Sequence, residues 1–178
     1  LDLGGGVRME LVRIPAGEFL MGDAAGQADE RPVTRVRIER VFWMGRLEVT
    51  NEQYGLFDPS HESRFEHKGS WSFSEHHLGW PLDSPAQPVV RVSWDQAKAF
   101  CRWLAERGGL KVDLPTEAQW EYACRARTTS RNYSGDSDAV AGVAWYVKTT
   151  GPFNRSNMPR IQPVAQKQPN AWGLHDML

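Results

Sequence analysis

Four of the five histidines fall in one stretch of about thirty residues, between Asp58 and Pro88, together with aromatic side chains. The stretch contains His61, His67, Trp71, Phe73, His76, His77 and Trp80. Imidazole is a common metal ligand, so one hypothesis is a metal site. Against it, ligands on a loop have no fixed spacing, the adjacent His76 and His77 point in different directions on an extended chain, and no cysteine accompanies them. The alternatives are a ligand-contact surface, a solvated loop, or aromatic residues packed over the domain.

A second group of candidate ligands carries side-chain oxygens and lies farther along the chain. It consists of Asp136, Asp138, Asn154 and Asn157, in a region without clear periodicity. Carboxylate and amide oxygens are the ligands that calcium prefers, so these residues are calcium candidates. An ordinary polar turn is the favoured alternative.

Several other chemistries are excluded by missing motifs. The chain has no G-x-S-x-G sequence, and Gly4-Gly5-Gly6 lacks the preceding strand and following lysine of a phosphate-binding loop. The two cysteines, Cys101 and Cys124, are too far apart for a C-x-x-C site and too few for a disulfide framework. We interpret them as buried thiols.

The composition is that of a soluble globular protein, with 40% hydrophobic and 24% charged residues. The 21 basic and 22 acidic residues are dispersed, so we expect neither a nucleic-acid surface nor a membrane partner. No signal peptide or transmembrane segment is visible, which leaves a cytoplasmic and an exported protein both open. A length of 178 residues predicts a single domain, 1–178.

Composition and short sequence patterns predict the loops and strands that position these residues. Eight tryptophans, 16 glycines and 11 prolines indicate many loops around aromatic anchors. Residues 9–21 place apolar residues on both sides of the turn-forming segment 15–17, which favours a short hairpin. In 33–44, Val36 and Ile38 alternate with charged residues, which is typical of an edge strand.

Three helix starts share a capping box, in which a hydroxyl N-cap is followed three residues later by glutamine. The pairs are Thr50 with Gln53, Ser93 with Gln96, and Thr116 with Gln119. The second helix runs from Ser93 to about Arg107 and carries an inward stripe of Trp94, Ala97, Cys101 and Leu104. On the third helix, the spacing of Trp120, Ala123 and Cys124 also places the thiol beneath the surface. From Thr128 onward the pattern predicts neither a convincing helix nor a long strand.

Several segments, in this order, resemble the formylglycine-generating enzyme family, also called the sulfatase-modifying factor family. They are IPAGEFLMGD at 14–23, DERPVTRVRI at 29–38, FWMGRLEVTNEQY at 42–54, PVVRVSWDQAKAFCRWL at 88–104, LPTEAQWEYACRA at 114–126 and PVAQKQPNAWGLHDM at 163–177. The resemblance implies an α+β fold of C-type-lectin-like character. It also implies a sulfatase-type protein or peptide substrate, a cysteine of which is oxidised to formylglycine by molecular oxygen and copper(I) bound to two thiolates. Thiolates are ligands that select copper(I).

The resemblance gives Cys101 and Cys124 no catalytic role, because they match family cysteines on two core helices, which in some members pair with cysteines farther along. We expect the copper-binding pair, and part of a structural calcium site, to lie beyond Leu178. The resemblance implies a second calcium site that draws on an Asn and a later Asp, and this sequence reads AWYVKTT at 144–150 and FNRSN at 153–157 there. No catalytic residue is therefore assigned, and we expect the isolated chain to be inactive and aggregation-prone, with Trp94, Trp120 and Trp172 partly uncovered.

The sequence is compatible with three functions. One is a sulfatase-modifying oxidoreductase, in which this chain supplies scaffold and part of the substrate groove. The second is a non-catalytic, C-type-lectin-like module that binds a ligand or protein through the stretch His61 to Trp80. The third is a relative of the iron-dependent sulfoxide synthases, which join a similar domain to a histidine-bearing bundle.

Overall fold

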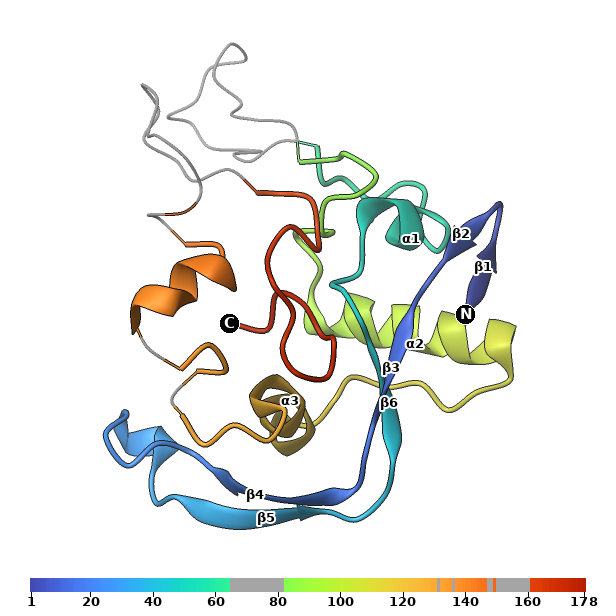
Figure 1. Cartoon of the computed structure of the whole chain (residues 1–178). Helices are drawn as coiled ribbons and strands as arrows, with labels where there is room; N and C mark the ends of the chain where they lie inside the picture. The colour runs from blue at the N-terminus through green and yellow to red at the C-terminus, as the bar shows by residue number, and fades with distance from the viewer. Residues whose placement is uncertain (65–81, 131, 136, 147–148, 150–160) are drawn as a thin grey trace. The chain divides into compact units, whose positions relative to one another are not determined.

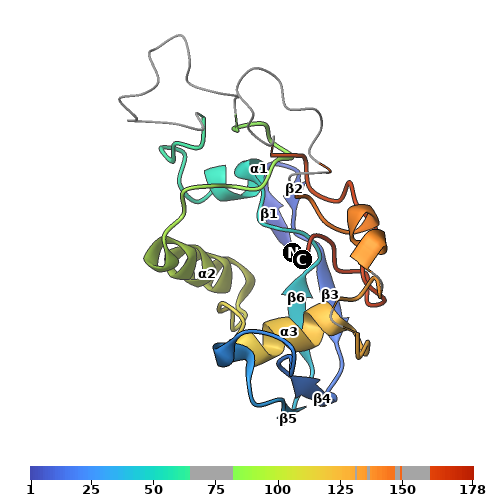
Figure 2. The same ribbon diagram turned by 90° about the vertical axis from the view of Figure 1, so that its left-hand side faces the viewer.

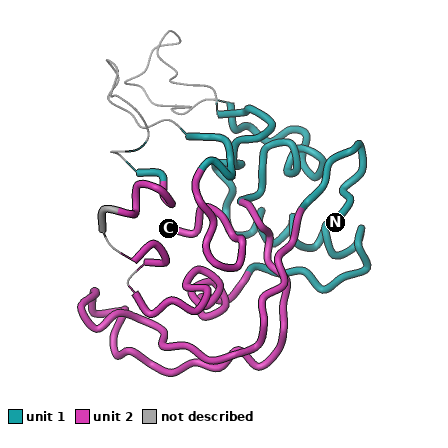
Figure 3. Tube along the Cα trace, in the orientation of Figure 1, with its two compact units in different colours: residues 1–9, 48–114, 145–166 teal, residues 10–47, 115–144, 167–178 magenta. Residues whose placement is uncertain are grey.

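A computed structural model of the chain describes residues 1–64, 82–130, 132–135, 137–146, 149 and 161–178. The chain divides into two compact units (Figure 3). Unit 1 comprises residues 1–9, 48–114 and 145–166, and unit 2 comprises residues 10–47, 115–144 and 167–178. No helix in the described ranges is both long and apolar enough to cross a membrane.

Unit 2 is built on two antiparallel ribbons and one helix (Figure 1). Strand β3 (Leu11–Ile14) pairs with β6 (Phe42–Gly45), and β4 (Gly17–Met21) pairs with β5 (Thr34–Ile38). The predicted hairpin across 15–17 is therefore wrong, because β3 and β4 do not pair with each other. They are two halves of one arm of a longer, bent hairpin. Pro15 has no N–H to contribute to a ladder, so the chain bends at this point instead of reversing.

The predicted alternation of β5 is confirmed. Ile38 is buried and Val36 is partly buried, whereas Arg35 and Arg37 on the other face are exposed. A short 3-10 helix, η1 (Ala28–Glu30), lies in the polar turn that joins β4 to β5. Helix α3 (Glu117–Arg125) lies next to β4 and β5 in both ribbon views (Figures 1 and 2).

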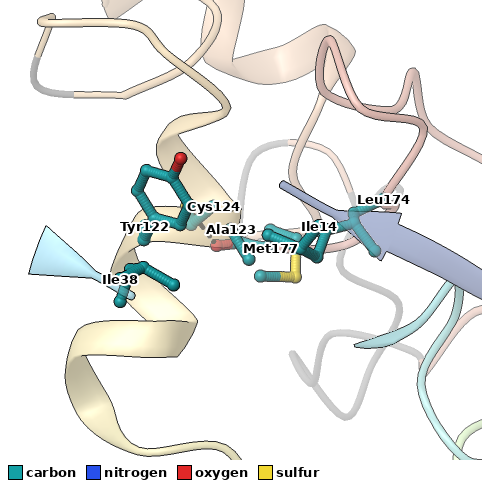
Figure 4. Close-up of a cluster of buried hydrophobic side chains, with 7 residues drawn as sticks. All are labelled: Ile14, Ile38, Tyr122, Ala123, Cys124, Leu174 and Met177. Atoms are coloured by element: carbon teal, nitrogen blue, oxygen red, sulfur yellow. Dashed lines mark hydrogen bonds between the residues drawn. The ribbon is translucent and has the colours of Figure 1, made fainter. Parts of the chain in front are cut away.

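The core of unit 2 forms where β3, β5, α3 and the C-terminal segment meet (Figure 4). Its buried residues are Ile14, Ile38, Tyr122, Ala123, Cys124, Leu174 and Met177. Beyond α3, the described residues contain only one further helical segment, the short 3-10 helix η3 (Ser137–Gly142). This agrees with the absence of helical periodicity after Thr128.

Unit 1 contains the strand pair β1 (Asp2–Gly4) and β2 (Val7–Arg8), together with helices α1 (Asn51–Gly55) and α2 (Trp94–Gly108). Its buried core is formed by Leu3, Tyr54, Phe100 and Leu104. The guanidinium of Arg107 donates to the carbonyl oxygen of Leu3 at 2.9 Å and so connects the end of α2 to β1.

All three predicted capping boxes are confirmed, at Thr50, Ser93 and Thr116. Helix α2 ends at Gly109, which adopts the left-handed conformation with φ of 62° that glycine accepts without steric cost.

The prediction that Trp94 belongs to the inward stripe of α2 is wrong, since its side chain is 67% exposed. Trp94 is the first residue of the helix, and Lys98 Nζ lies 5.5 Å from the centre of its ring. The stripe that is buried consists of Phe100, Cys101 and Leu104. Trp120 is also 44% exposed, and Trp172 is partly buried, so the three tryptophans are partly uncovered as expected.

Candidate functional site

His61 is the one residue of the predicted histidine-rich surface that falls within the described ranges, and it lies in unit 1. Its ring packs edge-on against the ring of Tyr54, with 4.8 Å between the centroids. The Nε2 atom lies 2.8 Å from the carbonyl oxygen of Val90. Because a carbonyl only accepts, Nε2 carries a proton in this contact.

A pocket of about 210 Å³ opens beside this ring pair. It is lined by residues of α1 and of the segments that follow it, including Tyr54, Asp58, His61, Glu62, Arg64 and Asp83. The hydroxyl of Ser60 donates to the Asp58 carboxylate at 2.6 Å, and the backbone N–H of Ser60 donates to the same oxygen at 3.0 Å. These hydrogen bonds hold the pKa of the Asp58 carboxyl below its usual value, so the group is a carboxylate at neutral pH.

The side chain of Tyr54 forms part of the wall of this pocket. Tyr54 is only 2% exposed, yet its hydroxyl has no hydrogen-bond partner in the described part of the chain. Burial, and secondarily the charge of Asp58, raises the pKa of Tyr54, so the phenol is protonated at neutral pH. The pocket is therefore lined by a fixed carboxylate, whereas the Tyr54 hydroxyl is buried away from solvent.

The other predicted site residues are not tested by the structure. His67, Trp71, Phe73, His76, His77 and Trp80 lie outside the described residues, as do the calcium candidates Asp136, Asn154 and Asn157. Asp138 falls in η3, but its side chain is also outside what the structure describes. Among the described residues, no group of three His, Cys, Asp or Glu side chains could hold a metal ion.

The prediction that both cysteines are buried thiols is confirmed. Cys101 lies on α2 in unit 1 and Cys124 lies on α3 in unit 2. Burial raises the pKa of both thiols, and it raises that of Cys124 to about 11. The Sγ of Cys124 also lies 3.1 Å from the carbonyl oxygen of Met177, to which its S–H can donate. Both sulfurs are therefore neutral thiols near pH 7, whereas a metal ligand or nucleophile is a thiolate.

A second pocket, of about 350 Å³, lies in unit 2 between β4 and the end of α3, and sequence reasoning missed it. Arg125 forms part of its wall and is held by three acceptors: the Glu121 carboxylate at 2.7 Å, Gly22 O at 2.9 Å and Ser130 O at 3.2 Å. The i,i+4 spacing of Glu121 and Arg125 was the one local signal for this ion pair. The acceptors Gly22 O and Ser130 O had no signal in the sequence.

The same pocket is bordered by a turn in an uncommon backbone conformation. Ala126 and Arg127 both have positive φ, of 44° and 75°. Side chains with a Cβ rarely adopt these angles, so two in succession indicate a backbone held by its surroundings. Arg127 is exposed and its charge opposes the effect of burial on the pKa of Tyr122.

Comparison with known proteins finds relatives along nearly the whole chain. Residues 7–178 match the family model for the sulfatase-modifying factor enzyme 1-like domain. The chain is 31% identical to a formylglycine-generating enzyme of Streptomyces coelicolor, over 92% of this chain and 64% of that protein. It is 29% identical to a protein of Bos taurus named inactive C-alpha-formylglycine-generating enzyme 2, over 100% of this chain and 70% of that one.

Among solved structures, PvdO from Pseudomonas aeruginosa matches with a TM-score of 0.71 and 26% sequence identity, covering 94% of this chain and 66% of that chain. This likeness and the mixture of short strands and few helices confirm the expected α+β fold of the resembled family. The C-type-lectin-like character remains a prediction.

Proposed function

Because this chain belongs to the sulfatase-modifying factor enzyme 1-like domain family, we propose that it forms part of an oxidoreductase that converts a cysteine of a sulfatase to formylglycine. The substrate is a protein or peptide with the segment C-x-P-x-R, and the reaction uses molecular oxygen and copper(I). The observation that carries the proposal is the family match over residues 7–178, which extends through segments of both units.

The thiols of this chain do not fit a copper(I) site. Such a site needs two thiolates, whereas Cys101 and Cys124 are buried, and burial raises the pKa of each above its ordinary value. The proposal therefore assigns the copper-binding cysteines to sequence outside these 178 residues. No step of the oxidation is assigned to Cys101 or Cys124.

The role proposed for the described residues is to form the framework of the enzyme. Helix α3 and the segment 170–177 form one buried core in unit 2, and α1 and α2 contribute to the core of unit 1. The calcium candidates Asp136, Asp138, Asn154 and Asn157 remain part of the proposal, as ligands of a structural ion in the complete domain.

An activity assay tests the proposal on the intact protein that contains this chain. The protein is loaded with copper(I) and incubated with oxygen and a sulfatase-derived C-x-P-x-R peptide. Mass spectrometry should detect conversion of the peptide cysteine to an aldehyde, and a hydrazine-type probe should then label it. A folded, copper-loaded protein that leaves the peptide cysteine unchanged would contradict the proposal.

Two variants serve as matched controls for the role of the thiols. Cys101→Ala removes one sulfur, and Cys124→Ser keeps a donor to the carbonyl of Met177. Both variants should retain turnover in proportion to the folded fraction, because neither sulfur takes part in the chemistry. Loss of copper binding in either folded variant would mean that the ligands are wrongly assigned.

A second candidate function is a non-catalytic module that binds a ligand or protein through the stretch His61 to Trp80. It is favoured by the pocket beside His61, which has polar groups suited to a small ligand. The sequence that follows Leu178 in the gene separates the two candidates. A pair of cysteines with four residues between them favours the oxidase, and its absence favours the binding module.

A further inference from the structure

We propose that the free edge of β4 is a docking site for an extended, acidic peptide segment of a partner protein. The segment adds to β4 as a further strand, and one of its carboxylates pairs with the guanidinium of Arg127. The residues of the site all belong to unit 2, and none of them takes part in cysteine oxidation. The inference therefore goes beyond the oxidase proposal and does not depend on it.

The pocket of about 350 Å³ in unit 2 lies along one edge of β4. Successive side chains of a strand point to opposite faces, yet the neighbours Glu18, Phe19 and Leu20 all line this pocket. A pocket bordered by both faces of a strand lies at its edge. The other edge of β4 is occupied by β5, and no residue of β5 lines the pocket. The pocket is therefore on the edge that β5 leaves open.

This open edge presents backbone groups without partners. Alternate residues of a strand direct their N–H and C=O away from the paired strand. Within the described ranges, the backbone groups of 18–21 have no hydrogen-bond partner other than β5. Such an edge is a template for pairing with another extended chain.

Just beyond the strand, side chains of α3 take the place of a neighbouring strand. The N–H of Gly22 donates to the Glu121 carboxylate at 2.9 Å, and the C=O of Gly22 accepts from Arg125 at 2.9 Å. Both Gly22 and Arg125 line the pocket. The helix therefore satisfies the backbone at the end of β4 and leaves the rest of the edge for an added strand.

The side chains beside this edge suit a peptide. Strand β4 has the sequence GEFLM and contains neither lysine nor proline, the residues that commonly protect an open edge. Leu20 and Val33 line the pocket and are exposed, so they can pack on an apolar side chain of the docked segment. In strand addition, backbone hydrogen bonds provide affinity, and contacts with alternate side chains provide specificity.

Three of the four charged side chains that line the pocket are engaged by other groups of the protein. Arg125 pairs with Glu121 at 2.7 Å, and Glu18 pairs with Arg35 at 3.8 Å. The Oδ1 of Asp23 accepts from a backbone N–H of its own turn at 2.9 Å. These three groups therefore do not set the charge of the ligand.

Arg127 is the fourth charged side chain, and its guanidinium has no hydrogen bond or ion pair in the part of the chain that the structure describes. Burial raises the pKa of Tyr122, which also lines the pocket, and the charge of Arg127 acts against this rise. The guanidinium therefore lies within electrostatic reach of the pocket wall. A carboxylate of the docked segment can pair with it without displacing an existing partner.

The test is binding of a fluorescent peptide to the intact protein, measured by fluorescence anisotropy. The peptide alternates valine and threonine around one central glutamate, and the matched control has glutamine at that position. We expect saturable binding of the glutamate peptide and about fivefold weaker binding of the glutamine peptide. Equal affinities would overturn the acidic partner. No binding of either peptide, because another part of the protein or a second copy covers the edge, would overturn the docking site.

Backbone N-methylation tests whether the peptide adds as a strand. Alternate N–H groups of an extended peptide point to opposite sides, so methylation of one alternate set removes every donor to β4, and methylation of the other set removes none. One methylated peptide should lose binding, and the other should bind as the parent peptide does. If the two methylated peptides bind alike, the proposal fails.

Amide hydrogen exchange locates the peptide on the protein. Alternate N–H groups of 18–20 should exchange about tenfold more slowly at saturation, because they gain a hydrogen-bond partner. The amides of β2 in unit 1 should not change and serve as the control. Protection that leaves β4 unaffected would place the peptide elsewhere and overturn the proposal.

Variants of Arg127 separate binding from stability. Arg127→Gln and Arg127→Gly each remove the guanidinium, so affinity for the glutamate peptide should fall to that for the glutamine peptide. Arg37→Gln removes an exposed guanidinium of β5 outside the pocket and should leave both affinities unchanged. A φ of 75° suits glycine, so Arg127→Gly should be at least as stable as the parent, and its loss of affinity is not a loss of fold.

If both Arg127 variants keep the preference for glutamate, the guanidinium is not the partner and the proposal fails. Peptide oxidation is not measured in any of these experiments, so failure here is distinct from failure of the oxidase proposal.

Discussion

The side-chain amide of Asn170 donates to the carbonyl oxygen of Cys124 at 3.0 Å, at the end of α3. The same Nδ2 donates to Ala123 O at 2.8 Å, and Oδ1 accepts from the N–H groups of Trp172 and Leu174 at 3.0 and 3.2 Å. The buried side chain of Asn170 therefore satisfies two carbonyl oxygens near the C-terminal end of α3. It also holds the segment 170–174 against this helix.

We predict that Asn170→Asp lowers the free energy of unfolding by about 3 kcal/mol, because a carboxylate cannot donate to the two carbonyls and brings a buried charge. Urea denaturation of the intact protein, with Gln168→Ala as an exposed control, measures the change. A loss no larger than that of the control would mean that the hydrogen bonds of Asn170 are replaced by water.

The buried thiol of Cys124 predicts a pH dependence of stability. Burial raises its pKa from 9.0 to about 11, so folding favours the neutral thiol. The stabilisation is therefore complete below pH 9 and is lost as pH rises toward about 11. Cys124→Ser has no such titration and keeps a donor to Met177. The difference in unfolding free energy between parent and variant should shift in favour of the variant over this range. A constant difference would contradict the assignment.

The capping boxes of α2 and α3 predict a graded effect. Ser93→Ala and Thr116→Ala should each cost about 1 kcal/mol, because each exposes a backbone N–H that the hydroxyl now satisfies. Gln96→Ala and Gln119→Ala remove only the return bond to the N-cap backbone and should cost less. Thermal unfolding measures the series, with the exposed Glu106→Ala as control. Equal costs for the hydroxyl and glutamine variants would not fit this mechanism.

The left-handed conformation of Arg127 predicts a stabilising substitution. Its φ of 75° is accessible to glycine without a Cβ clash, so Arg127→Gly should raise the free energy of unfolding by about 0.5–1 kcal/mol. Arg127→Ala removes the guanidinium but keeps the Cβ, and it should give no such gain. If both variants change stability alike, the charge of Arg127 is responsible and not its backbone conformation.

Much of the local structure was predictable because its signals are contained within a single turn. A hydroxyl and a glutamine three residues apart are enough to mark the starts of α1, α2 and α3. The alternation at Val36 and Ile38 likewise indicates one buried and one solvent-exposed face, whichever strand is the partner. Helical spacing placed Cys101 and Cys124 in the interior, and the family segments indicated the α+β fold.

Other features depend on residues that are distant in the sequence. The sequence of 9–21 is compatible with pairing of β3 and β4, but these strands pair instead with β6 and β5, which lie farther along the chain. Trp94 lies on the spacing of the buried stripe, but the core of unit 1 does not extend to the first turn of α2. His61 could be singled out from composition, whereas its contact with Val90, the buried hydroxyl of Tyr54 and the conformation of Arg127 could not. Capping and alternation are set by energies within one element, while strand pairing, burial and pockets arise only when distant segments close on each other.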